Sequence, residues 1–143
     1  MHPSQACIDL VKASEGCRLT AYRDSVGVLT IGYGSTGGIK EGQTITQAQA
    51  EEMLIDDLDA AAEGVRKLVT VPLNQGQFDA LCDFVFNLGE GRLRESTLLR
   101  RLNAGLYQQA AAQFQFWVMA GGHALPGLVT RRAKERAMFE GTS

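Results

Sequence analysis

Residues 15 to 34 read EGCRLTAYRDSVGVLTIGYG, and the rest of the chain is best interpreted outward from them. A carboxyl group, Glu15, stands where a helical pattern ends, and a second, Asp24, stands in a turn signal between two strand-like runs. A hydroxyl, Thr30, lies within the second run. Cleavage of a glycosidic bond needs one carboxyl group to protonate the leaving oxygen and another on the opposite face of the sugar. Two acids on different rigid elements that face one cleft meet that requirement.

The composition is typical of one soluble globular domain, expected here to span residues 1–143, with 45% hydrophobic and 21% charged residues. Residues 1–91 hold 6 Lys and Arg and 13 Asp and Glu, which gives a charge of −7. Residues 92–143 hold 8 Lys and Arg and 3 Asp and Glu, which gives +5, and the sum is the net charge of −2. The basic C-terminal third favours an anionic polymer such as a cell-wall glycan or nucleic acid. Solvated helix faces explain the same asymmetry without a partner.

The cysteines and histidines indicate no metal site and no cofactor. Cys7, Cys17 and Cys82 are odd in number and have no C-x-x-C spacing. The two histidines, His2 and His123, are too few and too far apart for a metal site or a Ser–His pair. We therefore expect reduced, mostly buried thiols, with a Cys7–Cys17 bridge as the alternative after export.

The N-terminal half predicts a helix over residues 4–14, strands over 18–23 and 28–33, and a long helix over about 47–68. Gly16 ends the first helix at Glu15, and Asp24 opens the turn between the strands. The loop from 34 to 42 is expected to hold a third short strand. Thr46 and Gln49 form a capping box for the long helix.

From Pro72 onward the pattern is helical throughout. The first expected helix is opened by Asn74 and Gln77 and ended by Gly89 and Gly91. A short helix follows, capped by Ser96 and running through Leu102. The next runs from Leu106 to Val118 and is broken by Gly121 and Gly122, and the last starts at Pro126. The predicted fold is α+β and mostly α. A small N-terminal β-hairpin lobe (about 15–45) is joined by the long helix to a larger helical lobe (about 72–139, with helix 4–14), and the active-site cleft lies between the lobes.

The pattern E-G-x-x-L-x-x-Y-x-D-x-x-G-x-x-T-I-G-Y-G at residues 15–34 resembles the catalytic signature of phage-type lysozymes, the endolysin muramidases of glycoside hydrolase family 24. Further family-like blocks follow in order: the capped interlobe helix, F-x-x-L-x-x-F-x-F-N-L-G at 78–89, S-T-L-L-R-R-L-N at 96–103, W-x-x-x-G-G at 117–122 and P-G-L-V-x-R-R-x-x-E at 126–135. The resemblance covers nearly the whole chain and implies a lysozyme-like fold.

The resemblance implies roles for three residues. Glu15 would be the general acid, the ionised Asp24 would stabilise positive charge at the anomeric carbon, and Thr30 would hold the attacking water. Each also has a purely structural interpretation, with Glu15 as a surface acid at a helix end, Asp24 as a turn residue and Thr30 as a strand residue.

Substrate contacts are expected at Gly34, Thr36, Phe86, Asn87 and Arg131. Gly34 lets the backbone approach a ligand closely, although it could equally be a strand kink. Phe86 and Asn87 resemble the cleft floor of the family, with Phe86 equally suited to the core. Arg131 resembles an arginine near the active site, and an ordinary helix-surface arginine is the alternative.

Two stretches depart from the family pattern. Many relatives have histidine where this chain has Ser35, which removes a local His–carboxylate pair. The stretch Gly91-Arg92-Leu93-Arg94 is more basic than the small apolar loop expected of relatives, and contact with an anionic wall polymer would use it.

The implied activity is hydrolysis, with inversion, of the β-1,4 bond between N-acetylmuramic acid and N-acetylglucosamine in peptidoglycan during phage-mediated lysis. The alternatives are a peptidoglycan-binding module that has lost catalysis and a lytic transglycosylase. We expect a monomer that binds glycan strands, binds no nucleic acid and has no membrane span. It would reside in the host cytoplasm before lysis and act on the periplasmic wall, its export segment being absent or removed.

Overall fold

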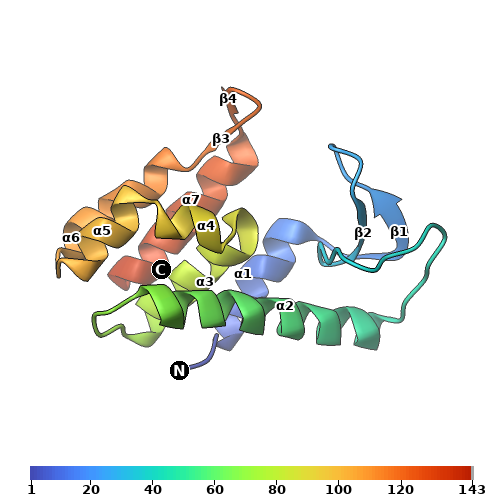
Figure 1. The fold of residues 1–143 in the computed structure, drawn as a ribbon, viewed down its shortest axis with the longest axis horizontal. Helices are drawn as coiled ribbons and strands as arrows, with labels where there is room; N and C mark the ends of the chain where they lie inside the picture. The colour runs from blue at the N-terminus through green and yellow to red at the C-terminus, as the bar shows by residue number, and fades with distance from the viewer. Residues whose placement is uncertain (143) are drawn as a thin grey trace.

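A computed structural model describes residues 1–142, which form two lobes joined by a long helix (Figure 1). The small lobe contains the antiparallel pair β1 (Arg18–Arg23) and β2 (Leu29–Gly32), and the long helix is α2 (Gln47–Leu68). Figure 1 shows α2 running along one side of the molecule from the hairpin lobe to the helical lobe. The predicted α+β, mostly helical arrangement is confirmed.

The hairpin places Thr30 opposite Tyr22 and Leu29 opposite Arg23, with an irregularity in the register toward Arg18. The expected third strand within residues 34–42 does not form. Instead Thr44 makes an isolated bridge with Thr20 on the other edge of β1. The reason is backbone conformation, because the glycines of the stretch have φ near +70 to +90° and therefore favour turns over extended chain: Gly34, Gly37, Gly38 and Gly42.

The predicted capping box of α2 is present, and a second one opens α3. At α2 the Thr46 side chain accepts from the Gln49 amide and the Gln49 side chain accepts from the Thr46 amide. Asn74 and Gln77 make the same reciprocal pair at the start of α3. Each box satisfies two amides that the first turn of a helix leaves without partners.

The helical lobe consists of α1, the first helix of the chain, together with the helices that follow α2. Their bounds are α1 Gln5–Glu15, α3 Gln75–Leu88, α4 Glu90–Arg94, α5 Thr97–Asn103, α6 Tyr107–Gln113 and α7 Pro126–Glu140. None of the helices in this described part of the chain is long and apolar enough to cross a membrane.

Two sequence expectations in this lobe were wrong. Gly89, with φ +96°, ends α3 alone, and Gly91 lies inside α4. The helix expected from Leu106 to Val118 stops at Gln113 and continues as a 3₁₀ turn, η1 (Phe114–Phe116). That tighter turn brings residues three apart onto one side, so Phe114 and Trp117 both pack edge-on against Phe84, with ring centroids 5.9 and 5.4 Å away.

A second hairpin, also absent from the sequence expectations, follows Trp117. It pairs β3 (Met119–Ala120) with β4 (His123–Ala124) around Gly121 and Gly122. Figure 1 shows it projecting from the helical lobe just before α7.

The core is centred on α3, in which every residue from Phe78 to Val85 is buried. A helix buried on all sides is normally apolar, yet this stretch includes Asp79 and Asp83. Asp79 accepts bonds from the Ser4 amide, the Ser4 hydroxyl and Gln75. The partner of Asp83 lies on α7 and belongs to the candidate site.

Gly76 marks a close approach of α3 to α7. A Cβ atom there would collide with the backbone oxygen of Met138. We expect Gly76→Ala to lower the free energy of unfolding by about 1–3 kcal/mol, because the overpacking outweighs the helix propensity of alanine. Urea unfolding measures this. The matched control is Gly91→Ala, also inside a helix but with nothing within 4 Å, which should leave stability equal or higher; equal effects of the two changes would refute the steric explanation.

Candidate active site

Glu15 is the last residue of α1, and Gly16 ends the helix there with φ +67°. The Glu15 side chain is 23% exposed. Its Oε2 accepts a bond of 2.6 Å from Nη1 of Arg131 on α7. The carboxyl group is therefore held at a fixed place while part of it faces solvent.

The loop after β2 approaches the same carboxyl group from the small lobe. Gly34 has φ +90°, and a Cβ atom at this position would lie 3.0 Å from Glu15 Oε1. Only glycine combines this backbone conformation with such a close approach. The two lobes thus meet at Glu15 and Gly34.

Asp24 and Thr30 are connected through one residue of the hairpin, Val28. Oδ1 of Asp24 accepts from the amides of Val26 and Val28, at 3.0 and 2.9 Å. The hydroxyl of Thr30 donates to the Val28 carbonyl at 2.9 Å. Asp24 is exposed and Thr30 is buried. Asp24 therefore does perform the turn-forming role, and it remains accessible for a second one.

Two pockets flank the contact between Glu15 and Gly34. One of about 500 Å³ is lined by Ala13, Ser14, Glu15, Asn87, Leu125, Gly127, Leu128, Thr130, Arg131 and Lys134. The other, of about 330 Å³, is lined by Gly34, Thr36, Asp57, Ala60, Ala61, Val85, Phe86 and Glu90.

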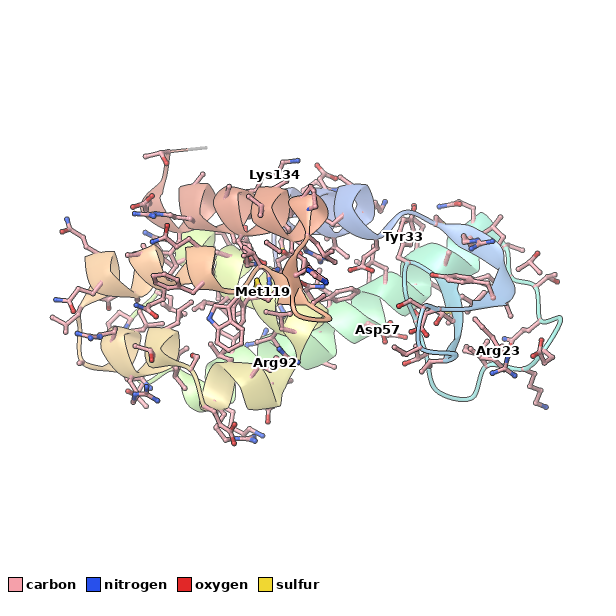
Figure 2. All side chains as sticks on the ribbon, turned by 90° about the horizontal axis from the view of Figure 1, so that it is seen from above. Arg23, Tyr33, Asp57, Arg92, Met119 and Lys134 are labelled. Carbon is pink, nitrogen blue, oxygen red and sulfur yellow. The ribbon has the colours of Figure 1, made fainter. Side chains whose placement is uncertain are left out.

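The expected site residues divide between these pockets. Glu15, Asn87 and Arg131 share the first pocket, and the other three expected contact residues, Gly34, Thr36 and Phe86, share the second. Asp24 and Thr30 line neither. Figure 2, seen from above, places Tyr33 and Asp57 between the small lobe, which carries Arg23, and the helical lobe.

Three of the expected residues also contact the core beneath the pockets. Phe86 is half-buried and packs against the hydrophobic core as well as lining a pocket. Asn87 accepts a 2.8 Å bond from Arg132. Arg131 is buried, 5% exposed, and so is not the helix-surface arginine that was the alternative.

Arg131 has a second partner that sequence reasoning missed. Its Nε and Nη2 donate to both oxygens of Asp83, at 2.9 and 2.8 Å, and the Asp83 side chain is fully buried. The next arginine, Arg132, contacts the buried Glu135 at 2.8 Å. An aspartate within the apolar run F-D-A-L-C-D-F-V-F was the signal available in the sequence, because a buried acid needs a cationic or hydrogen-bonding partner.

Only one of the two buried acids, Asp83 and Glu135, favours its charged form. Burial opposes the charge on Asp83, but hydrogen bonds from Glu135 and Arg131 and the positive charge of both arginines outweigh it, so the pKa of Asp83 lies below its ordinary value. Burial, followed by the hydrogen bond to Asp83 and its charge, raises the pKa of Glu135 well above the ordinary value despite the attraction of Arg132. The surroundings therefore favour the charged form of Asp83 and the neutral form of Glu135.

Another contact missed by sequence reasoning joins the small lobe to α2. The hydroxyl of Ser35 is buried and donates to Asp57 at 2.6 Å. The loop that carries Gly34 is thereby attached to the interlobe helix. No His–carboxylate pair was expected at this position, and Ser35 makes a hydroxyl–carboxylate bond there.

No group of three or more His, Cys, Asp or Glu residues within positions 1–142 is arranged to hold a metal ion. Cys7, Cys17 and Cys82 are free thiols. Burial raises the pKa of Cys82 to about 12 and that of Cys7 further, so both stay protonated and unreactive.

Comparison with known proteins identifies the family. The Phage lysozyme family model matches residues 12–135. The chain is 44% identical to the endolysin of Salmonella phage P22 over 145 residues, 97% of this chain and 98% of that protein. A crystal structure of a P22 lysozyme mutant superimposes with a TM-score of 0.87 at 42% identity, covering 98% of this chain and 99% of that one. The chain belongs to the phage lysozyme family.

Not every relative has this length. The endolysin of Bacillus phage PZA is 46% identical over 142 residues, and the match covers 97% of this chain but 55% of that protein. The chain thus spans about half of the PZA endolysin and nearly all of the P22 endolysin.

The proton on Glu135 should appear in the pH dependence of stability. The unfolded chain loses that proton near pH 4.3, whereas the native protein keeps it to higher pH, so the contribution of Glu135 to stability falls as pH rises above about 4.3. Glu135→Gln cannot ionise. We expect its stability relative to wild type to grow with pH between 4.5 and 7, by up to about 1.4 kcal/mol per unit, in urea unfolding.

The matched control is Glu140→Gln, an exposed acid of the same helix paired with Arg136. Its stability relative to wild type should be nearly independent of pH. A flat difference for Glu135→Gln as well would mean that Glu135 is ionised in the native protein.

Proposed function

We propose that this chain is a peptidoglycan muramidase that hydrolyses the β-1,4 bond between N-acetylmuramic acid and N-acetylglucosamine with inversion. The observation that carries the proposal is the Glu15 carboxyl group, held by Arg131 at the mouth of a pocket and closely approached by Gly34 of the other lobe. Membership of the phage lysozyme family supports the substrate class. The chain would serve as an endolysin, like the P22 relative whose length it shares.

Three residues divide the chemistry in this proposal. Glu15 protonates the leaving glycosidic oxygen, which is the role of a general acid. Asp24, a carboxyl group on the exposed hairpin turn, stabilises the positive charge that develops at the anomeric carbon. Thr30 orients the water that attacks from the opposite face, and an inverting reaction needs the two carboxyl groups roughly 6.5–9.5 Å apart to leave room for that water.

The two pockets would bind the glycan strand. The strand would lie across both, with Gly34, Thr36 and Phe86 on one side of the scissile bond and Asn87 and Arg131 on the other. The two lobes would act as one domain and as a monomer. The protein would act on the cell wall after residing in the host cytoplasm.

Replacement of the acid tests the activity. We expect Glu15→Gln to fold normally and to lose at least about 100-fold in the rate of reducing-sugar release from purified peptidoglycan, because the amide has no proton to transfer. The matched control is Glu52→Gln, an exposed position on α2 that should retain wild-type activity.

The products distinguish the alternatives to hydrolysis. Mass spectrometry should find reducing ends that carry one added water, whereas a transglycosylase leaves 1,6-anhydro ends that lack it. Binding to walls without any cleavage by the wild type would indicate a binding module. Full activity of Glu15→Gln would exclude Glu15 as the acid.

Gly34 tests whether the close approach of the small lobe matters. In Gly34→Ala the new methyl group would displace the Glu15 carboxyl group, so we expect about a 10- to 100-fold loss of peptidoglycan hydrolysis. The matched control is Gly37→Ala, which has a similar φ of +87° but open space around it. Both should lose about 1 kcal/mol or more of stability to backbone strain, and only Gly34→Ala should lose activity. Equal activities would contradict the steric argument.

A further inference from the structure

The guanidinium group of Arg131 is shared between two carboxylates from different helices. Two of its nitrogens, Nε and Nη2, bond both oxygens of Asp83 on α3, at 2.9 and 2.8 Å. The third nitrogen, Nη1, bonds Glu15 at the end of α1, at 2.6 Å. The bidentate pair with Asp83 is the geometrically stronger one and is fully removed from solvent at the aspartate.

This arrangement bears on the proposed role of Glu15. A general acid must carry a proton at the start of the reaction. A guanidinium group within hydrogen-bond distance favours the ionised carboxylate and so works against that requirement. If Arg131 had Glu15 as its sole counter-ion, Glu15 would be a poor acid.

We propose that Asp83 is a positioning residue that balances the charge of Arg131, so that Glu15 is held in place by a guanidinium group whose charge is already neutralised. The inference rests on the proposed function of Glu15 as the acid. Because Arg131 keeps two bonds to Asp83, it stays in position when Glu15 is protonated and when it is ionised.

The other titratable and charged groups near Asp83 leave it as the counter-ion. Burial and the charge of Asp83 raise the pKa of Glu135 on α7, and burial raises the pKa of the Cys7 and Cys82 thiols, so all three groups favour their neutral forms. Asp79, one turn earlier on α3, is occupied by Ser4 and Gln75. The nearby cations are Arg66, which pairs with Glu63, Lys134 on the pocket wall, and Arg132, which contacts Glu135 and Asn87 and whose charge also acts on Asp83.

The test is the pH profile of kcat/KM on purified peptidoglycan for a cycle of variants. Because Glu135 adjoins Asp83 and a change in its own ionisation would alter the charge near Arg131, the cycle is built on Glu135→Gln. Added to it, Asp83→Asn should move the alkaline limb of the profile to lower pH by about one unit, since Glu15 then faces an unbalanced cation. Arg131→Gln should move that limb to higher pH by a similar amount.

The decisive variant carries both substitutions, D83N and R131Q, in the same background. It removes one negative and one positive charge, so its alkaline limb should return to within about 0.3 pH units of the parent, even where its rate is lower. If D83N alone does not fold, R131Q and the combined variant answer the same question, because the combined variant removes both members of the buried Asp83–Arg131 pair.

A merely structural role for Asp83 would lower kcat/KM equally at every pH and leave the limb in place, and that result would overturn the inference. Carbon-13 NMR titration of the Glu15 carboxyl group in the same proteins measures the shift without relying on catalysis. If the wild type does not cleave peptidoglycan while the NMR shifts follow the cycle, the proposed function fails and the charge balance stands. If cleavage is normal and neither measurement shifts, the charge balance fails alone.

Discussion

The arrangement of the site depends on one buried arginine. Arg131 extends from α7 to Asp83 on α3 and to Glu15 at the end of α1, so a single planar group sets the positions of three helices around the pocket. A buried guanidinium group is tolerated only with nearly complete pairing, because its desolvation costs several kcal/mol. The same requirement that fixes Arg131 therefore fixes the carboxyl group that faces the pocket.

The small lobe supplies the other side of the site but cannot be stable alone. An isolated two-stranded hairpin is marginal in water, and β1 and β2 form only such a pair. The hairpin is stabilised by burying Ile31 and Tyr33 and by the bond from Ser35 to Asp57 on α2. The interlobe helix thus carries the loop with Gly34 to Glu15, and the hairpin turn with Asp24 extends beyond it.

Much of this was readable in the sequence because the signals are local. The capping pairs Thr46–Gln49 and Asn74–Gln77 predicted where α2 and α3 begin, since a cap is satisfied within one turn. Asp24 and Gly27, both typical turn residues, predicted the hairpin. One expectation failed because a distant residue decides the structure: Phe84, about thirty residues earlier, packs against Phe114 and Trp117 at the 3₁₀ turn, and no local sequence pattern predicts that contact.

The sequence by itself determined the first hairpin, the long helices, the family and the three residues proposed for the chemistry, because periodicity, caps and the motif at residues 15–34 are properties of neighbouring positions. Only the tertiary structure decided that Arg131 is buried, that Asp83 and not Glu135 is its counter-ion, and that Ser35 bonds Asp57. These choices depend on which groups from separate helices lie within 3 Å of each other and away from water, where the strength of electrostatic pairing is set by burial rather than by sequence distance.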